Sequence, residues 1–258
     1  MSQIFSLKMI KKSIKKFIPK FILKYREKYI VKKTRNQFLH MNNNEIFKKI
    51  YLEKLRCPEN EKKNFKFYSG IGSHSSELFN KYISSVKDFI LSLPEKPNVV
   101  DLGCGDFAIG SKIRKFCNNY IAVDIYDELI QFNKEKYKDL NVDFRIFDMT
   151  QDLLPSADIC FVRQVLQHLS NESINNFLKL SKNKYKYLVV TEHFPISKNF
   201  VANIDKPTGW DIRYYDNSAV DLTAPPFNLK TISDANLCEI YSDTIGGFLK
   251  TRLLQMKK

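Results

Sequence analysis

The chain has 258 residues, of which 43% are hydrophobic, so it is long enough to bury one sizeable core and to carry an appendage. Its formal net charge of +14 is uneven, because residues 1–35 contain 12 Lys and Arg and a single acid. Since the remaining residues are nearly neutral, the basic balance does not indicate nucleic-acid binding by the whole protein. Five scattered cysteines without a C-x-x-C pair predict neither a disulfide framework nor a zinc site, and no metal is expected.

Residues 1–43 are predicted to form a basic amphipathic tail. Apolar residues recur at helical spacing between residues 10 and 25, with lysines between them and an interruption at Pro19. Such a segment either contacts an anionic membrane surface or a partner enzyme, or covers an apolar patch of its own domain. Lysines break every apolar run, so no signal peptide or membrane span is predicted. The protein is expected in the cytoplasm, where the tail could reach the inner face of the membrane.

Two helices are predicted in residues 44–97, a helical segment that precedes the main domain. The first runs from Asn44 to about Leu55 after an asparagine run that can cap it, and the second runs from about Ser76 to Leu91. A loop with the sequence F-Y-S-G-I-G-S-H separates them and contains two of the eight glycines of the chain.

Residues 98–258 alternate between predicted strands and helices. The strands are expected at 98–102, 120–124, 142–147, 158–162 and 185–192, and the helices at 107–117, 127–137 and 171–182. This alternation is typical of an α/β domain with a mostly parallel sheet covered on both faces. Residues 237–242 and 248–256 predict two further strands around a tight turn, which form a C-terminal antiparallel hairpin and complete a seven-stranded sheet.

A glycine loop follows the first of these strands in the run V-V-D-L-G-C-G, and Asp124 ends the next strand 21 residues after Gly103. Glycines directly after a buried strand let the backbone approach a ligand, and a carboxylate at the end of the next strand can accept ribose hydroxyls. The third glycine of a dinucleotide fingerprint is replaced by alanine. Asp101 and Asp106 would repel a diphosphate but suit a cationic sulfonium and its amino group. The pattern therefore predicts a site for an adenine nucleoside.

This pattern resembles the glycine loop of the Rossmann-like class I S-adenosylmethionine-dependent methyltransferases. The resemblance implies S-adenosyl-L-methionine as cofactor, S-adenosyl-L-homocysteine as product, and a lid segment over the methionine end of the ligand. In the family pattern Asp124 holds the ribose and Asp148 meets the adenine amino group, whereas Phe107 stands where many members have a third glycine. The cofactor-binding residues expected on this basis are Tyr68, Gly70, Asp101, Gly103, Cys104, Gly105, Asp124, Ile125, Asp148, Met149, Arg163 and Gln164.

The acceptor pocket is expected on the loops after the fourth and fifth strands, because ligands of such sheets bind beyond the carboxyl ends of the strands. His168 and His193 are the candidate catalytic bases there, since free histidine titrates close to working pH, although either side chain could line the site without catalysing. An insertion over residues 194–230 contains the only Trp and two adjacent tyrosines, which favours a substrate lid over a surface loop. The predicted substrate-binding residues are Arg163, His193, Lys206, Trp210, Arg213 and Tyr214, whose cations could gather around an anion.

Longer sequence motifs point to a narrower group within these methyltransferases. The N/D-P-P-Y/F motif of amino-methyltransferases is absent after the fourth strand, which disfavours methylation of nucleic-acid bases. The runs F-Y-S-G-x-G-S-H, F-V-R-Q-V-L-Q-H-L-S and L-T-A-P-P-F-N-L are similar to those of bacterial methyltransferases linked to O-methyl phosphoramidate decoration of capsules. The resemblance implies a small or nucleotide-linked anionic substrate, with a phosphoramidate oxygen as acceptor. Two alternatives stay open: a sugar hydroxyl methylated with a histidine base, and a noncatalytic S-adenosylmethionine-binding scaffold.

Overall fold

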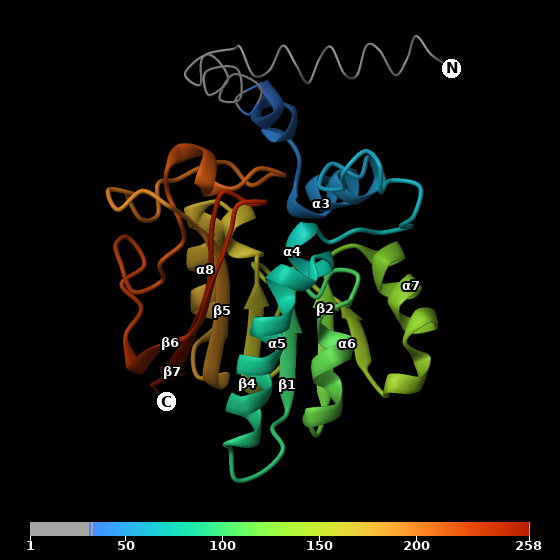
Figure 1. The fold of residues 1–258 in the computed structure, drawn as a ribbon, viewed down its shortest axis with the longest axis vertical. Helices are drawn as coiled ribbons and strands as arrows, with labels where there is room; N and C mark the ends of the chain where they lie inside the picture. Colours follow the sequence, from blue (N-terminus) through green and yellow to red (C-terminus); the bar gives the residue numbers. More distant parts are fainter. Residues whose placement is uncertain (1–30, 32, 258) are drawn as a thin grey trace.

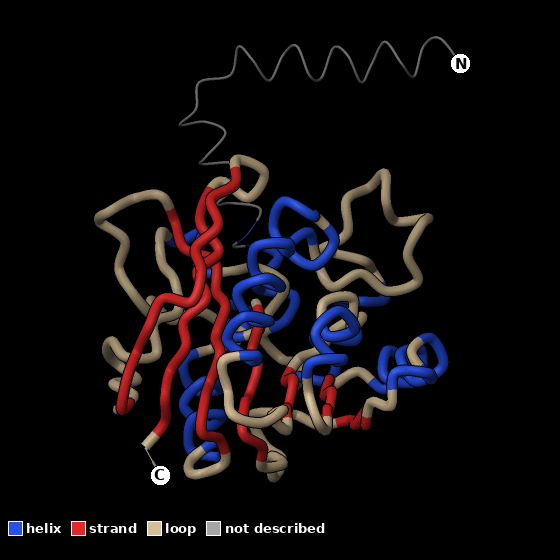
Figure 2. Tube along the Cα trace, turned by 60° about the horizontal axis from the view of Figure 1, so that its bottom comes forward, coloured by secondary structure: helices blue, strands red, loops and turns tan. Residues whose placement is uncertain are grey.

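The computed structural model describes residue 31 and residues 33–257. Seven strands form one sheet in the order β3-β2-β1-β4-β5-β7-β6. Strands β1 to β5 pair in parallel, while β7 pairs antiparallel with both β5 and β6. The strands are β1 (Val99–Leu102), β2 (Tyr120–Asp124), β3 (Asp143–Ile146), β4 (Ala157–Arg163), β5 (Tyr185–Pro195), β6 (Thr231–Ser242) and β7 (Gly247–Met256). The predicted Rossmann-like fold is confirmed, and the hairpin at its edge is longer than expected because β6 begins at Thr231 (Figure 2).

Helices cover both faces of this sheet. The α-helices that lie wholly within residues 33–257 are α3 (Asn43–Leu52), α4 (Ile71–His74), α5 (Ser76–Leu91), α6 (Gly110–Ile113), α7 (Asp127–Lys136) and α8 (Asn171–Ser181). The short 3-10 turns are η1 (Asn36–Phe38), η2 (Arg114–Phe116), η3 (Lys138–Leu140), η4 (Leu166–His168) and η5 (Arg213–Asp216). Helices α5 and α6 lie in front of the strands in Figure 1, and α3 lies beyond their carboxyl ends.

Alternating side chains divide the buried residues of the sheet into two cores. Val99 and Phe161 join the cluster under α5 and α6, whereas Val100 and Val162 join the one under α8. Because successive side chains of a strand point to opposite faces, consecutive apolar residues can be buried only where both faces are covered. This arrangement leaves the edge formed by the carboxyl ends of β1 to β5 as the place where polar loops meet.

The end of the predicted tail packs on this domain. Val31 and Phe38 are buried, and Phe38 contacts the cluster of Ile46 and Ile50 from α3, against which Trp210 also packs. The residues predicted to form an amphipathic helix, 10–25, lie outside the described part of the chain. Among the described residues, no helix is both long and apolar enough to cross a membrane.

The helix predicted over residues 107–117 is shorter than expected. Phe107 has a φ of +57°, and α6 begins only at Gly110 and gives way to η2 after four residues. A left-handed residue cannot continue a right-handed helix. The Phe107 ring offsets the strain of this conformation by packing edge-on against Tyr120 and Phe144, with centroids 5.5 and 5.0 Å away.

Candidate cofactor and acceptor cleft

A cleft lies at the carboxyl ends of β1 to β4, under the lid formed by α3 and α4, and it contains about 1000 Å³ of empty space when its open mouth is included. Ten of the twelve predicted cofactor residues line it, namely Asp101, Gly103, Cys104, Gly105, Asp124, Ile125, Asp148, Met149, Arg163 and Gln164. Tyr68 and Gly70 do not line it, contrary to the sequence expectation. The ring of Tyr68 instead stacks on His74 with centroids 4.4 Å apart, and so supports the lid from behind.

The two glycines of the loop after β1 are needed for contacts within the protein. Gly103 and Gly105 have φ values of +73° and +58°, a region that side chains rarely occupy. A Cβ on Gly103 would lie 2.5 Å from Val165 Cγ2, and one on Gly105 would lie 2.1 Å from Ser69 Oγ. The glycines therefore let the lid and the loop after β4 close on the glycine loop, whereas the sequence suggested only the approach of a ligand.

Two buried carboxylates lie on the floor of the cleft. Asp124 Oδ2 accepts the amide of Gly105 at 3.0 Å and its Oδ1 accepts the amide of Ile125 at 2.9 Å, so the acid at the end of β2 holds the glycine loop. Asp101 Oδ2 accepts the hydroxyl of Tyr120 at 3.0 Å. Burial raises the pKa of Asp101 to about 7 and also raises the pKa of Asp124.

Asp148 is already saturated with hydrogen bonds. Its Oδ1 accepts the amide and hydroxyl of Thr150, and its Oδ2 accepts the side-chain amides of Asn43 and Gln151. A carboxylate has about four acceptor positions. The implied contact between Asp148 and an adenine amino group therefore requires Asn43 or Gln151 to move.

Asp106 directly precedes the helix predicted over residues 107–117, but because α6 begins only at Gly110 it instead ties the lid to the glycine loop. Its Oδ2 lies 2.6 Å from His74 Nε2, and its amide donates to Ser69 Oγ at 2.6 Å. Burial alone would raise the pKa of Asp106, but the hydrogen bond and charge of His74 hold it below its ordinary value.

Arg163 is the buried cation at the end of β4. Its Nη2 donates to the carbonyl of Gly72 at 2.6 Å, its Nη1 donates to Ser73 Oγ at 3.1 Å, and its guanidinium lies 4.9 Å from the centre of the Tyr82 ring. The Nε atom is buried and has no hydrogen-bond partner within the described residues. A buried, unsatisfied N–H on the cleft wall fits a carboxylate ligand such as that of the methionine moiety.

The two candidate catalytic histidines lie in different places. His168 lines the cleft, with Nδ1 3.3 Å from the carbonyl of Asp211 and Nε2 3.5 Å from Arg56 Nη1. Burial, together with Arg56 and Lys206, keeps the pKa of His168 well below 6.5. His193 does not line the cleft. Its ring stacks on Tyr214 with centroids 4.5 Å apart, and burial lowers its pKa to about 4.

Of the three cations predicted to surround an anionic acceptor, Arg163 lines the cleft, whereas Lys206 and Arg213 do not. Lys206 is buried 3.5 Å from Asp211 and donates to the carbonyl of Pro207 at 2.7 Å. The guanidinium of Arg213 is buried and donates to the carbonyls of Leu166 and Ile204 and to Asn171 Oδ1. Neither residue lines the cleft, because acceptors within the protein occupy their donors.

The aromatic residues of the insertion also pack inward rather than into the cleft. Trp210 lies with Phe38 and α3, while the hydroxyl of Tyr214 donates to the carbonyl of Gly246 at 3.0 Å. The insertion thus covers the domain beside the cleft, which was the alternative to a substrate lid.

Two polar residues at the site were missed by the sequence reasoning. Glu192, fully buried at the end of β5, accepts the amides of Leu166 and Gln167 at 3.1 and 2.9 Å and so caps the turn that carries His168. The run T-E-H at the end of a predicted strand was the only signal for it. Arg56 lines the cleft from the lid side, and nothing in its local sequence distinguishes it from the many basic residues nearby.

Comparisons with known proteins agree with this geometry. Residues 100–183 match a family model described as a methyltransferase domain. "Putative methyltransferase 235L" of Invertebrate iridescent virus 6 is 25% identical over 159 residues, which are 58% of this chain and 58% of the relative. The chain thus spans less than two thirds of the length of this curated relative.

Solved structures share the fold. The N-methyltransferase NodS from Bradyrhizobium japonicum WM9, in complex with S-adenosyl-L-homocysteine, has a TM-score of 0.56 at 12% identity and covers 80% of this chain and 97% of its own. The magnesium protoporphyrin IX methyltransferase ChlM from Synechocystis PCC 6803, with bound S-adenosylmethionine, has a TM-score of 0.54 at 13% identity and covers 84% and 99%. The chain therefore has the Rossmann-like fold of these structures, and its residues 100–183 match a methyltransferase domain. The ligands in these two neighbours, S-adenosyl-L-homocysteine and S-adenosylmethionine, are the ones that the sequence resemblance implies for this chain.

Proposed function

We propose that the protein transfers a methyl group from S-adenosylmethionine to an oxygen that is already negatively charged, in a phosphoramidate-type precursor of a capsular polysaccharide. The distribution of charge along the cleft carries this proposal. The carboxylates among the described lining residues lie in, or shortly after, the carboxyl ends of β1, β2 and β3, and they are Asp101, Asp106, Asp124 and Asp148. The end of β4 and the lid instead contribute the guanidinium groups of Arg163 and Arg56. An anionic acceptor is attracted to this second side of the cleft.

The first side, together with Arg163 at the border of the second, suits the cofactor. Asp124 has an acceptor position left for a ribose hydroxyl, Tyr120 occupies only one oxygen of Asp101, and Arg163 Nε has no partner within the described chain. Asp124 would hold the ribose of S-adenosylmethionine, Asp101 its amino group and Arg163 its carboxylate. S-adenosylmethionine, when bound, supplies an electrophilic methyl group that an oxyanion takes as the carbon–sulfur bond breaks, with no proton to release.

The histidines favour an acceptor that needs no base. An efficient general base has a pKa near the operating pH, whereas burial keeps the pKa of His168 well below 6.5. His193 lies behind the cleft wall against Tyr214.

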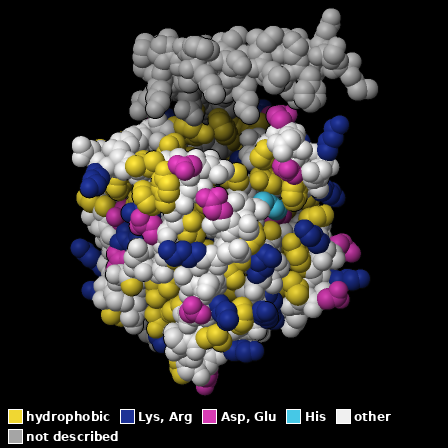
Figure 3. All heavy atoms as spheres, in the orientation of Figure 1, with side chains coloured by type: hydrophobic (Ala, Val, Ile, Leu, Met, Phe, Trp, Pro, Cys, Tyr) yellow, Lys and Arg dark blue, Asp and Glu magenta, His cyan; other side chains and the backbone are white. Residues whose placement is uncertain are grey.

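The phosphoramidate assignment is supported by the sequence runs that resemble those of capsule methyltransferases. The basic residues 1–35 would provide the contact with an anionic membrane surface or partner enzyme. By contrast, Lys and Arg are scattered singly over the face of the domain seen in Figure 3.

Two matched acceptors test the proposal. The full chain is incubated with S-adenosylmethionine and either a sugar that carries an O-linked phosphoramidate or the same sugar with a free hydroxyl, and the products are identified by mass spectrometry. We expect a methyl ester of the phosphoramidate, at a rate that is flat from about pH 6 to 9. Methylation of the hydroxyl, with a rate that rises through about pH 6.5, would replace this proposal with the histidine-base alternative. Cofactor binding without transfer to either acceptor, or to extracted capsule precursors, would indicate a noncatalytic scaffold.

A further inference from the structure

Arg56 is a cation on the cleft wall that forms no ion pair with the predicted cofactor residues, although its charge opposes the rise in the pKa of Asp124 that burial causes. Its guanidinium lies over the ring of Tyr51, 5.1 Å from the centroid, and its Nη1 is 3.5 Å from His168 Nε2. It forms no ion pair with any residue that the structure describes, and its Nε is buried without a hydrogen-bond partner. A buried N–H without a partner costs stability, so such a group on a cleft wall indicates a ligand.

The end of α3 fixes the position of this side chain. Lys54 has a φ of +50°, its amide donates to the carbonyl of Tyr51, and the next amide, of Leu55, donates to the carbonyl of Ile50. These two bonds form a Schellman motif, which ends the helix and turns the chain back toward it. Lys54 Nζ secures the turn by donating to the carbonyls of Lys62 and Phe65 at 2.6 and 2.7 Å. Arg56 thus returns over Tyr51 from a well-anchored backbone.

The two guanidinium groups of the cleft differ in what their nitrogens contact. Arg163 directs both terminal nitrogens to the lid, at Gly72 and Ser73, and keeps only Nε free. Arg56 makes one long contact, to His168, so neither its Nε nor its Nη2 has a hydrogen-bond partner within the described residues. An edge with two parallel N–H donors matches two oxygens of one phosphoryl or carboxylate group.

We propose that Arg56 binds the anionic group of the acceptor, with His168 beside it as a neutral wall of the same subsite. This inference rests on the proposed function and assigns the specificity-determining residue for it. The position supports the acceptor over the cofactor as the source of the anion. Arg56 adjoins the turn after β4, which carries His168, whereas the orphaned Nε of Arg163 lies by the residues that would hold the methionine end.

The experiment measures two affinities by calorimetry on the full chain: that of S-adenosylhomocysteine alone, and that of methyl phosphate with S-adenosylhomocysteine bound. We expect Arg56→Gln to weaken methyl phosphate binding by about tenfold or more and to change the cofactor affinity less than twofold. Arg56→Lys should recover part of the loss, because it keeps the charge without the planar edge. Lys48→Gln, which removes an exposed positive charge of α3 outside the cleft, should change neither affinity.

Three results would overturn the inference. Loss of S-adenosylhomocysteine affinity in Arg56→Gln with unchanged methyl phosphate binding would assign the residue to the cofactor carboxylate. If Arg56→Gln changes the affinity for neither S-adenosylhomocysteine nor methyl phosphate, Arg56 is a structural residue. The same conclusion follows if the wild-type protein binds no methyl phosphate. The proposed function fails separately: if Arg56→Gln weakens methyl phosphate binding while the pH profile of transfer shows a rising limb, the subsite stands and the base-free chemistry does not.

Discussion

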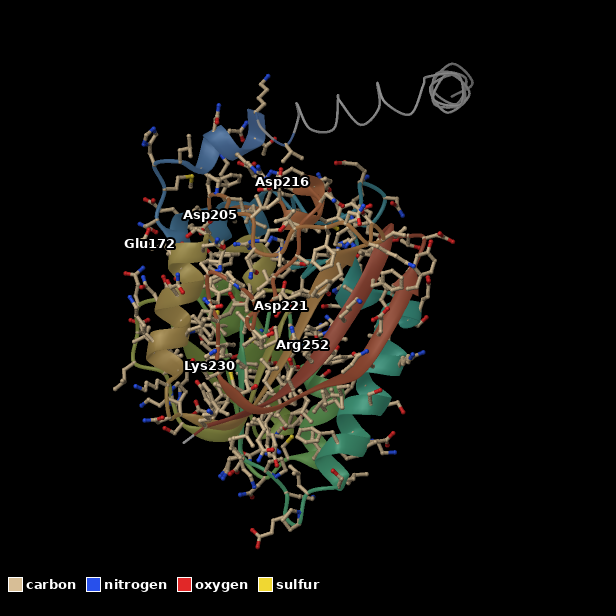
Figure 4. The ribbon with its side chains drawn as sticks, turned by 90° about the vertical axis from the view of Figure 1, so that its left-hand side faces the viewer. Glu172, Asp205, Asp216, Asp221, Lys230 and Arg252 are labelled. Carbon is tan, nitrogen blue, oxygen red and sulfur yellow. The ribbon has the colours of Figure 1, made fainter. Side chains whose placement is uncertain are left out.

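The guanidinium of Arg35 reaches the fully buried carboxylate of Asp211, with Nε 2.8 Å from Oδ2, across 176 positions of sequence. It also pairs with Asp216, which lies beneath the segment that precedes α3 in Figure 4. The other partner of the Asp211 carboxylate is the buried Lys206, whose Nζ lies 3.5 Å from Oδ1. The backbone carbonyl of Asp211 contacts Nδ1 of His168. The N-terminal segment, the insertion and the cleft are therefore held together at one residue, Asp211.

Asp211→Asn should lower the free energy of unfolding by about 3 kcal/mol, because it leaves the buried ammonium of Lys206 without a counter-charge. Asp216→Asn is the matched control. The Asp216 side chain is 30% exposed, so the loss of this pair should cost less than about 1 kcal/mol. Urea unfolding of both variants measures the difference, and equal losses would show that Asp211 is not the hub of this network.

Asp124→Asn should weaken the binding of S-adenosylhomocysteine by about 1.5–3 kcal/mol, the range for hydrogen bonds to a charged group. The variant keeps the volume of the side chain but loses the charge that accepts the Gly105 amide and that would receive a ribose hydroxyl. Calorimetry on the folded variant tests this expectation, with Asp127→Asn, an exposed acid at the start of α7, as the control. An unchanged affinity for the ligand would remove Asp124 from the cofactor site.

Substitutions of Phe107 should reverse the usual order of alanine and glycine. Both remove a fully buried ring, which costs about 3–5 kcal/mol. Alanine retains the strain of a side chain at φ +57°, on the order of 1 kcal/mol, and glycine relieves it. Phe107→Gly should therefore unfold at higher denaturant concentration than Phe107→Ala. If the alanine variant is the more stable of the two, the left-handed conformation of Phe107 stores no strain.

Acid should destabilise the protein in part through His193. Burial lowers the pKa of His193 to about 4, from 6.5 for free imidazole. Between these values the unfolded chain binds a proton that the folded protein does not, so the free energy of unfolding falls as the pH is lowered, by at most about 1.4 kcal/mol per pH unit. His193→Phe, which keeps a flat ring against Tyr214, should make this dependence shallower in urea titrations from pH 7 to 4. The exposed His40→Phe serves as control, and parallel curves for wild type and His193→Phe would contradict the assignment.

The sequence was sufficient for the sheet and for most of the cofactor side of the cleft. Alternating apolar runs and the glycine loop predicted all seven strands, and the predicted residues that line the cleft lie at or just after the ends of β1 to β4. Such positions are predictable because strand periodicity is local, and because parallel strands bring their carboxyl ends to the same edge of a sheet. The closing hairpin followed from the same local signals.

The charged side chains on the acceptor side of the cleft depend on hydrogen-bond and ion-pair partners that are distant in sequence, and only the tertiary structure shows these partners. Residue type alone predicts Arg213 and Lys206 as ligands of an anion. In the structure, backbone carbonyls of η4 accept hydrogen bonds from both side chains, and the carboxylate of Asp211 pairs with Lys206. Arg56 carried no local signal, and its free edge is set by the turn after α3 and by contact with Tyr51 and His168. A short-range pattern fixes which face or end of an element a side chain occupies. Whether a charged side chain is satisfied within the protein or left free for a ligand depends on which distant donors and acceptors the fold places beside it.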